Sequence, residues 1–281
     1  MRRESTDVFA ASSLLFVPGG RPDRFAKARA AGAGLTVIDC EDAVPAGEKD
    51  AARRAALEAI AGDREGFALR MNGVATDAGQ ADLAELSATG TLPATMLVPM
   101  VESAEELTEI RNTLGERCPR LIPLIETPRG LRHALTIASA DKIDAVFFGG
   151  GDFAGELGVA LSWEPLLLAR QQIILACAEA RVPAIDVPFI HLDDVDGLAE
   201  ECRRARALGF AAKAAIHPAQ VEAIEAVFSP TQEEIVEAAE ALAAFEQAGG
   251  RAIRHQGRML EAPLVKHYRA IIARSQGQIH A

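Results

Sequence analysis

The chain has 281 residues, of which 49% are hydrophobic and 25% are charged, a composition typical of a globular protein with a sizeable core. Its 40 acidic side chains outnumber 29 basic ones, and the formal charge of −11 argues against nucleic acids and anionic membranes as general partners. No apolar run approaches the roughly 18 residues that a membrane-spanning helix needs. One large domain or two ordinary ones would fit this length.

The start of the chain imitates an export signal. Arg2 and Arg3 precede an apolar stretch from Val8 to Val17. No small-residue cleavage site follows, and Pro18–Pro22 looks like a junction between a strand and a helix. The cysteines are scattered without a CxxC pair, as reduced core residues are, and not as a disulfide framework or zinc site; they are Cys40, Cys118, Cys177 and Cys202. We therefore expect a cytoplasmic protein.

Short, continuously apolar runs alternate with amphipathic stretches along the chain, a pattern that predicts buried parallel strands separated by helices. The predicted strands are Leu14–Pro18, Thr36–Asp39, Phe67–Met71, Thr95–Met100, Leu121–Glu126, Ala145–Phe148, Ala184–Val187 and Ala212–Ile216. The clearest predicted helices are Glu48–Ile60, Ser103–Leu114, Pro165–Ala180 and Leu198–Leu208. Ser103 and Glu106 have capping-box spacing at a helix start. Eight such units without an interior composition break predict an α/β fold, a (β/α)₈ TIM barrel.

The last part of the chain exceeds what a barrel requires. An acidic helix is predicted over Thr231–Gln247, and a basic final helix around Leu264–Arg274. We therefore expect a catalytic barrel over residues 1–228 and a C-terminal helical extension over residues 229–281. The extension could pack on its own barrel or reach a neighbouring subunit, and we favour the second arrangement.

Two acids, Glu126 and Asp152, each follow the end of a buried apolar run, about one strand–helix unit apart. In a barrel, loops at the carboxyl ends of the strands carry the active site, so these acids should converge from adjacent strands. Acids there can also simply cap the next helix. Mg²⁺ needs only one or two carboxylates and completes its octahedron with water and substrate oxygens, so the pair predicts a magnesium site.

Three glycines, Gly149–Gly151, directly precede Asp152. Small residues let the backbone N–H groups at the start of the next helix approach an anion closely. A metal beside such an anion site would suit a 2-oxo acid, held by its carboxylate and carbonyl oxygens.

Arg70 ends a strand that is otherwise apolar. It is either a structural arginine with a buried acidic partner, or a group that grips a carboxylate or stabilises a developing oxyanion, and both roles are compatible. Asp39, Glu41 and Asp42 are the nearby acids, and the sequence does not tell which of them faces a ligand and which pairs with the arginine.

Other chemistries find less support. His217 precedes Pro218, and is equally a base or a plain turn residue. Lys213 could form a Schiff base, but the paired acids favour enolate stabilisation by a metal. The sequence contains no His-x₃-His pair, no G-x-S-x-G and no G-x-G-x-x-G, which argues against zinc hydrolases, the usual serine hydrolases and dinucleotide binding.

A set of motifs recurs in order from about Ser13 to about Pro263. They are Ser13-Leu-Leu-Phe-Val-Pro-Gly19 with Arg21-Pro22, Val37-Ile-Asp-Cys-Glu-Asp-Ala-Val44, Arg70-x-Asn72, Val101-Glu-Ser103, Leu124-Ile-Glu-Thr127, Gly149-x-x-Asp152 with Leu157-Gly158, Pro183-Ala-Ile-Asp186 and Ile216-His-Pro-Ala-Gln220. Together they resemble the citrate lyase β-subunit-like branch of the HpcH/HpaI aldolase superfamily.

This resemblance implies a TIM barrel that oligomerises, commonly as a trimer, and a Mg²⁺-dependent carbon–carbon lyase. Relatives act on citryl-, malyl- or citramalyl-thioesters and give acetyl-CoA, or an acyl-carrier equivalent, and a 2-oxo acid such as oxaloacetate, glyoxylate or pyruvate. By position, Glu126 and Asp152 would bind Mg²⁺. Arg70 and Asp39 would belong to the catalytic groups, with Arg70 on the substrate carboxylate and enolate oxygen. Glu261 would be the acid/base offered by a neighbouring subunit.

The same resemblance implies the substrate contacts. The amides of Gly150 and Gly151 would cradle the oxo acid. The loop from Pro18 to Arg24, with Lys27 behind it, would lie toward the phosphates of coenzyme A.

The chain departs from the family pattern at three positions. Met100 stands where relatives often have Lys, Gly151 where many have an acid, and Glu261 where Asp is usual. Two alternatives therefore accompany the lyase: a class II pyruvate-type aldolase acting on free hydroxy-oxo acids, and a non-catalytic subunit that binds Mg²⁺ and an oxo acid without turnover.

Overall fold

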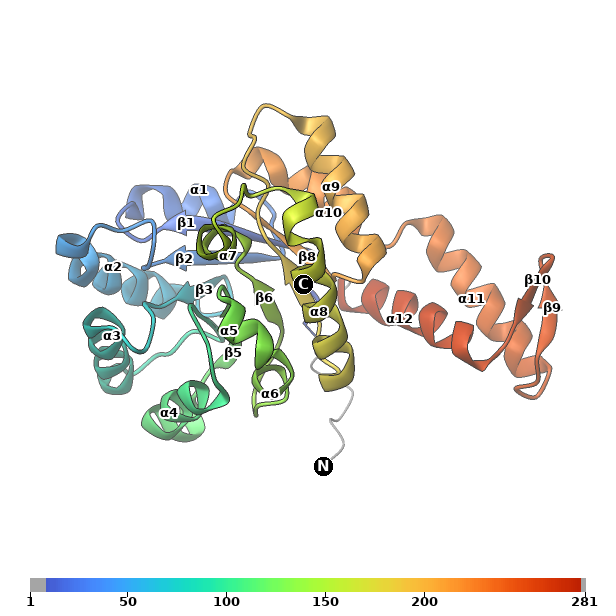
Figure 1. Cartoon of the computed structure of the whole chain (residues 1–281), viewed down its shortest axis with the longest axis horizontal. Helices are drawn as coiled ribbons and strands as arrows, with labels where there is room; N and C mark the ends of the chain where they lie inside the picture. Colours follow the sequence, from blue (N-terminus) through green and yellow to red (C-terminus); the bar gives the residue numbers. More distant parts are fainter. Residues whose placement is uncertain (1–8, 279–281) are drawn as a thin grey trace.

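The barrel is closed and entirely parallel. In this computed structural model, which describes residues 9–278, β1 pairs with both β2 and β8, so the sheet has no free edge (Figure 1). The strands are β1 Ser13–Pro18, β2 Leu35–Asp39, β3 Phe67–Arg70, β4 Thr95–Val98, β5 Arg120–Ile125, β6 Val146–Phe148, β7 Ala184–Asp186 and β8 Ala212–Ala215. The predicted barrel is confirmed.

Helices surround the barrel, and short 3₁₀ turns join several of them to the strands (Figure 1). The helices are α1 Phe25–Arg29, α2 Lys49–Gly62, α3 Asp77–Ala88, α4 Ala104–Leu114, α5 Pro128–Arg132, α6 Ala134–Ala138, α7 Gly150–Leu157, α8 Trp163–Ala180, α9 Val195–Leu208 and α10 Val221–Phe228. The 3₁₀ turns are η1 Pro22–Arg24, η2 Ala46–Glu48, η3 Gly115–Arg117 and η4 Pro218–Gln220.

The capping box predicted at Ser103 is only half correct. Ser103 is the N-cap of α4, but its hydroxyl accepts no helix N–H and instead donates to Glu106. Glu106 also accepts the N–H of Glu102, so its carboxylate holds the chain that enters the helix.

Adjacent strand residues face two different cores because successive side chains alternate across a strand. Leu14 and Val37 fill the barrel interior with Phe147 and Ile185. Their neighbours on the same strands, such as Leu15 and Ile38, pack outward against the helices. Both faces of the strands are thus buried, which is why the strands are continuously apolar in sequence.

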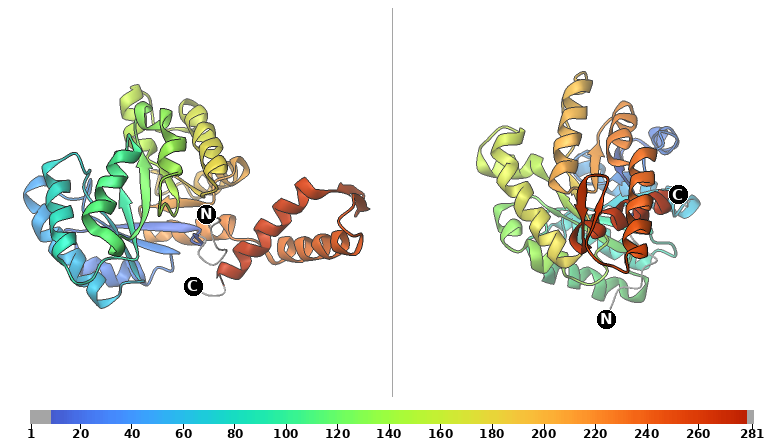
Figure 2. Two further views of the ribbon diagram at one scale, coloured as in Figure 1. Left: turned by 90° about the horizontal axis from the view of Figure 1, so that it is seen from below. Right: turned by 90° about the vertical axis from the view of Figure 1, so that its right-hand side faces the viewer.

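The extension projects away from the barrel as two helices running side by side, with a hairpin at the outer end (Figures 1 and 2). Its elements are α11 Gln232–Gln247, β9 Ile253–His255, β10 Arg258–Leu260 and α12 Ala262–Gln278. It has a small core of its own around Phe245, Leu260 and Val265. The hairpin was not predicted, because its strands are short and mostly exposed; Gln256 and Gly257, both with positive φ, make its tight turn.

The far end of α12 is anchored to the barrel. Arg274 donates hydrogen bonds to the carbonyls of Ala211 and Phe228, at 2.7 and 2.9 Å. Ala211 immediately precedes β8, so the anchor lies at the amino ends of the strands, opposite to the end where barrel active sites form.

Among residues 9–278, no helix is long and apolar enough to cross a membrane. The basic beginning of the stretch that imitates an export signal lies outside these residues. Its apolar end enters the barrel as β1, with Leu14 and Leu15 buried.

Candidate active site

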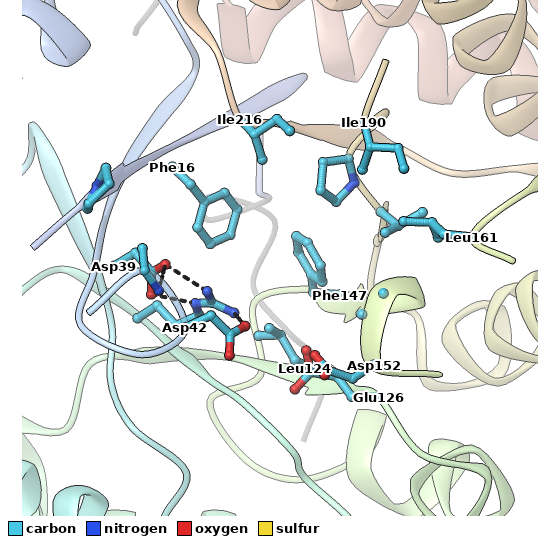
Figure 3. Close-up of a pocket in the computed structure, with 17 residues that line it drawn as sticks. Phe16, Asp39, Asp42, Leu124, Glu126, Phe147, Asp152, Leu161, Ile190 and Ile216 are labelled. Atoms are coloured by element: carbon cyan, nitrogen blue, oxygen red, sulfur yellow. Dashed lines mark hydrogen bonds and ion pairs between the residues drawn. The ribbon is translucent and has the colours of Figure 1, made fainter. Parts of the chain in front are cut away.

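A cavity of about 340 Å³ lies at the carboxyl ends of the strands (Figure 3). Of the residues predicted from the sequence to form the site, it is lined by Pro18, Asp39, Arg70, Glu126, Gly151 and Asp152. Strands 1, 2, 3, 5 and 6 of the barrel deliver these groups or the loops that carry them, so residues far apart in sequence meet at one rim.

Four other predicted residues do not line the cavity. Gly150 is buried, and a Cβ there would lie 3.1 Å from the Phe148 ring. Arg24 and Lys27 are exposed on η1 and α1. Glu261 is exposed in the extension, between β10 and α12, at the end of α12 that is not anchored.

Arg70 is buried and held by acids on three sides. Its Nε and Nη2 each lie 2.7 Å from one oxygen of Asp39, a bidentate pair, and its Nη1 lies 2.9 Å from Glu41 and 3.1 Å from Asp42. Burial disfavours the charged guanidinium, but the hydrogen bonds to Asp39 and the charges of Asp39, Glu41 and Asp42 together outweigh it and raise the pKa of Arg70. Phe16 covers one face of the guanidinium, 5.3 Å away.

These contacts resolve which acid aims the arginine. Besides Arg70, the two oxygens of Asp39 accept the N–H groups of Glu41 and Ala43. Asp39 is therefore the buried partner of the guanidinium, and each of its two oxygens already accepts two hydrogen bonds. The partner role that the sequence left open between Asp39, Glu41 and Asp42 falls mainly to Asp39.

Glu126 is a buried carboxylate with few donors. Its Oε2 accepts the N–H of Met100 at 2.6 Å, and it is 3% exposed. Burial raises its pKa to about 8, with nearby Asp152 adding to the shift and the Met100 N–H opposing it. Glu126 does not cap the helix after it, because Thr127 does so, accepting the N–H of Gly130. The capping alternative is therefore wrong for Glu126.

Asp152 lies in the first turn of α7, and its carboxylate is beside that of Glu126 (Figure 3). Its pKa is raised, first by partial burial and then by the charge of Asp42. The backbone of Gly149 fits against Glu126 so closely that a Cβ there would lie 2.2 Å from the Glu126 Cγ. Only glycine allows the two acids to approach in this way.

The donor set fits a hard divalent cation. Within the described residues, no three His, Cys, Asp or Glu side chains form a closed metal cage. Two neighbouring carboxylates with raised pKa values are what Mg²⁺ uses when water and substrate oxygens supply the other positions. A dication between Glu126 and Asp152 would stabilise both charged carboxylates, which burial disfavours.

Met100 holds an unusual backbone conformation. The predicted fourth strand ends two residues early, at Val98, because Pro99 has no N–H for the ladder. Met100 then takes a φ of 54°, in the left-handed region that is costly for a side-chain-bearing residue, and this turns its N–H toward Glu126. The strained backbone of Met100 thus positions an N–H group that holds the Oε2 of Glu126.

Lys213 is not placed for Schiff-base chemistry. It is fully buried, and its Nζ donates to Asp186 at 2.7 Å, to the Val187 carbonyl at 2.6 Å and to Glu201 at 2.7 Å. Burial works against its charge, but Asp186 and Glu201 outweigh it and raise the pKa of Lys213. Three acceptors take its three protons, which leaves no free amine for nucleophilic attack.

His217 has the second of its two predicted roles, that of a turn residue. Its Nδ1 accepts the N–H of Ala219 at 3.2 Å and it begins η4 with a capping box to Gln220. It is exposed and does not line the cavity.

The apolar side of the cavity was not predicted from the sequence. Its members are Phe16, Leu124, Phe147, Leu161, Val187, Pro188, Ile190 and Ile216. Figure 3 shows Leu161 and Ile190 across the cavity from Asp39 and Asp42. Most of these residues are in loops or at strand ends, where no periodic pattern marks them.

The sequence of this barrel matches a family model. Residues 12–218 match the model described as HpcH/HpaI aldolase/citrate lyase. The chain belongs to this family. Residues 169–277 also match a model described as a C–C bond lyase of the TIM-barrel fold. The family predicted from the motifs is confirmed.

Several family members are similar over most of their length. The human protein named citramalyl-CoA lyase, mitochondrial, is 32% identical over 90% of this chain and 82% of its own. The crystal structure of RipC from Yersinia pestis has a TM-score of 0.73 at 40% identity, covering 82% of this chain and all of RipC. CitE from Mycobacterium tuberculosis, in complex with magnesium, acetoacetate and coenzyme A, has a TM-score of 0.80 at 32% identity, covering 95% of this chain and 98% of CitE.

Proposed function

We propose that this protein is a Mg²⁺-dependent carbon–carbon lyase that cleaves a 3-hydroxy-carboxyacyl-CoA thioester, of the citryl-, malyl- or citramalyl-CoA type, to acetyl-CoA and a 2-oxo acid. The observation that carries the proposal is the convergence of Glu126 and Asp152 beside a buried, acid-held Arg70. A family relationship to a citramalyl-CoA lyase supports the substrate class.

Glu126 and Asp152 would hold the metal. Bound Mg²⁺ would polarise the 3-hydroxyl and carboxylate oxygens of the substrate as a Lewis acid. Gly151 lines the cavity next to Asp152 and supplies a backbone N–H group at the start of α7 for the carboxylate of the oxo acid. Gly150, which the sequence predicts in the same role, does not line the cavity.

Arg70 stabilises the negative charge that develops when the carbon–carbon bond breaks. Once a base takes the hydroxyl proton, the bond electrons move into the thioester as an enolate, and the 2-oxo acid is released. The guanidinium, held by Asp39, is already oriented for the enolate oxygen and needs no rearrangement. Asp39 therefore acts as a positioning residue, and protonation of the enolate gives acetyl-CoA.

Glu261 is the acid/base of a neighbouring subunit in this scheme. It cannot serve its own cavity readily, because Arg274 anchors α12 at the opposite end of the barrel and the helix between them spans about 20 Å. The extension, residues 229–281, then meets the catalytic barrel, residues 1–228, of another copy, most simply in a homotrimer.

The exposed Arg24 and Lys27 would face the phosphates of coenzyme A, and Pro18, on the preceding strand, lines the cavity. We place the protein in the cytoplasm, since its four cysteines are free buried thiols.

The test is lyase activity on citryl-CoA, malyl-CoA and citramalyl-CoA with Mg²⁺, followed by release of the oxo acid. Asp152→Ala is the control. Release from one thioester that disappears in the variant establishes the activity and names the substrate. No release from any thioester, while oxo acid still binds, would favour a class II aldolase on free acids or a non-catalytic binding subunit.

A further inference from the structure

The cavity has very little positive charge available for a substrate. Arg70 is the single cationic side chain that lines it among the described residues, whereas Asp39, Asp42, Glu126 and Asp152 line it with carboxylates. Within the proposed reaction, the metal neutralises part of this charge at Glu126 and Asp152 only.

Most of the hydrogen-bonding capacity of Arg70 is already used. Its Nε, its Nη1 and one side of its Nη2 face the carboxylates of Asp39, Glu41 and Asp42. An arginine has five N–H groups in a fixed planar fork. Three of them donate to Asp39 and Asp42, Nη1 also faces the Glu41 carboxylate 2.9 Å away, and one N–H on Nη2 faces no carboxylate. That N–H can serve one oxygen of the reacting thioester, but not a second carboxylate as well.

The other side of the cavity is apolar. We define the apolar wall as Leu161, Val187, Pro188 and Ile190, which follow α7 and β7. Phe147 adjoins it from β6, and Figure 3 shows Leu161 above Asp152. In the proposed reaction the oxo acid lies beside Asp152 and therefore next to this wall. A group on the third carbon of that acid, pointing away from the metal carboxylates, therefore meets carbon atoms.

A second cavity of about 110 Å³ lies behind the same wall. It shares all four wall residues with the first, and is lined in addition by Trp163, Arg170 and Glu201 among others. Arg170 does not supply a positive charge to the main cavity. It is 1% exposed and lies behind the wall, and its Nε–H donates to Asp186 at 2.8 Å.

We propose that this site takes 2-oxo acids whose third carbon carries only hydrogen or an apolar group, and that the apolar wall rejects those with a second carboxylate. The inference rests on the proposed lyase function and narrows it to thioesters that release pyruvate or a longer monocarboxylic 2-oxo acid. A second carboxylate at the wall would lose its water without gaining a cation, whereas a methyl group gains contacts there.

The first test is calorimetric binding to the full-length protein with Mg²⁺, using pyruvate, 2-oxobutanoate and freshly prepared oxaloacetate. We expect 2-oxobutanoate to bind at least as tightly as pyruvate, with an affinity up to about fourfold higher because of the added methylene. Oxaloacetate should bind about 100-fold more weakly than 2-oxobutanoate. Oxaloacetate binding within tenfold of 2-oxobutanoate would overturn the proposal.

The second test moves the charge into the wall. Ile190 is 46% exposed, so Ile190→Arg should fold, and Ile190→Met is the matched control of similar length without charge. The arginine variant should gain about tenfold or more in oxaloacetate affinity and lose affinity for 2-oxobutanoate. Leu161→Lys is the second variant if the first folds poorly. Equal oxaloacetate affinity in the charged and the neutral variant contradicts the assignment of the wall.

Cleavage assays keep the two proposals separate. If 2-oxobutanoate binds preferentially but no thioester is cleaved, the lyase function fails and the specificity of the site stands. If a thioester that releases oxaloacetate is cleaved with the highest kcat/KM, the lyase stands and the specificity inference is wrong.

Discussion

Two charge clusters at the strand ends of this barrel have opposite character. In the cavity cluster, Glu126 and Asp152 face each other with raised pKa values. In the second cluster, Asp186 is fully buried between Arg170 and Lys213, whose contacts lower its pKa although burial alone would raise it. Both clusters follow the same sequence pattern, an acid at the end of an apolar run.

The difference lies in the partners. The charges of the second cluster are balanced, with Glu201 also bonded to Lys213, and Arg170 stacks on Trp163 at 4.5 Å. Such a balanced cluster fixes the ends of β7 and β8, although the Nη1 of Arg170 is buried without a hydrogen-bond partner. The cavity cluster has an excess of acid, so it gains from a cation. Unsatisfied charge at a strand end marks the functional group, and satisfied charge marks the structural one.

The largest contrast should come from the same substitution in both clusters. Asp152→Asn removes one of the two proposed metal ligands, and we expect lyase activity to fall on the order of 1000-fold, with weakened Mg²⁺ binding by calorimetry. Its thermal stability without Mg²⁺ should be unchanged or higher, because the raised pKa of Asp152 means that its charge is unfavourable in the folded protein. A variant that keeps full activity would remove Asp152 from the metal site.

Asp186→Asn should behave in the opposite way. It leaves the buried Lys213 and Arg170 without their anion, so we expect the free energy of unfolding to fall by about 3 kcal/mol, measured by urea denaturation. Mg²⁺ affinity of the folded protein should stay within a few-fold of the wild type. If Asp186→Asn instead strongly weakened Mg²⁺ binding and left the stability intact, the second cluster would be the metal site and the assignment would be wrong.

Arg70→Lys tests the bidentate pairing inside the cavity cluster. Lysine keeps the charge but cannot span both oxygens of Asp39, so the charge is no longer aimed at the enolate. We expect kcat/KM to fall about 100-fold, mostly in kcat. Arg53→Lys, at another acid-paired arginine that does not line the cavity, is the control for a general loss of folding. If only KM rose and kcat stayed unchanged, Arg70 would contribute to substrate binding and not to stabilisation of the transition state.

The smallest effect is the pH dependence of the second cluster. The pKa of Asp186 is lowered in the folded protein, so its stabilising contribution is present above its ordinary pKa of 3.8 and is lost as the pH falls further. The difference in unfolding free energy between wild type and Asp186→Asn should therefore be constant from pH 5 to pH 8 and shrink near pH 3. A difference that shrinks already near pH 6 would mean that another group titrates in the cluster.

The predictable parts of the fold were those that depend on short-range patterns. Leu121–Ile125 could be read as a strand because both of its faces are buried and every residue is apolar or proline. Glu126 could be placed at the rim because it ends that run. The hairpin at Ile253–Leu260 could not be predicted in the same way, since its strands are only three residues long and largely exposed.

The roles within the site depend on contacts across strands, which the sequence does not contain. Asp39 was equally a catalytic acid or an arginine partner until its four donors were visible. Asp186 and Lys213 had the pattern of rim groups, but they pair with each other behind the cavity wall. Ile190 carries no sequence signal at all, because a single apolar residue in a loop matches no period.

The anchoring of α12 by Arg274 has a genetic consequence. Each copy keeps Asp152 in its own cavity but, under the proposed assignment, lends Glu261 to another copy. A chain lacking Asp152 and a chain lacking Glu261 would each be inactive alone, yet a mixed assembly would contain some cavities with both groups intact. Two null alleles of this protein would therefore complement each other within one cell, although neither chain carries a repaired site.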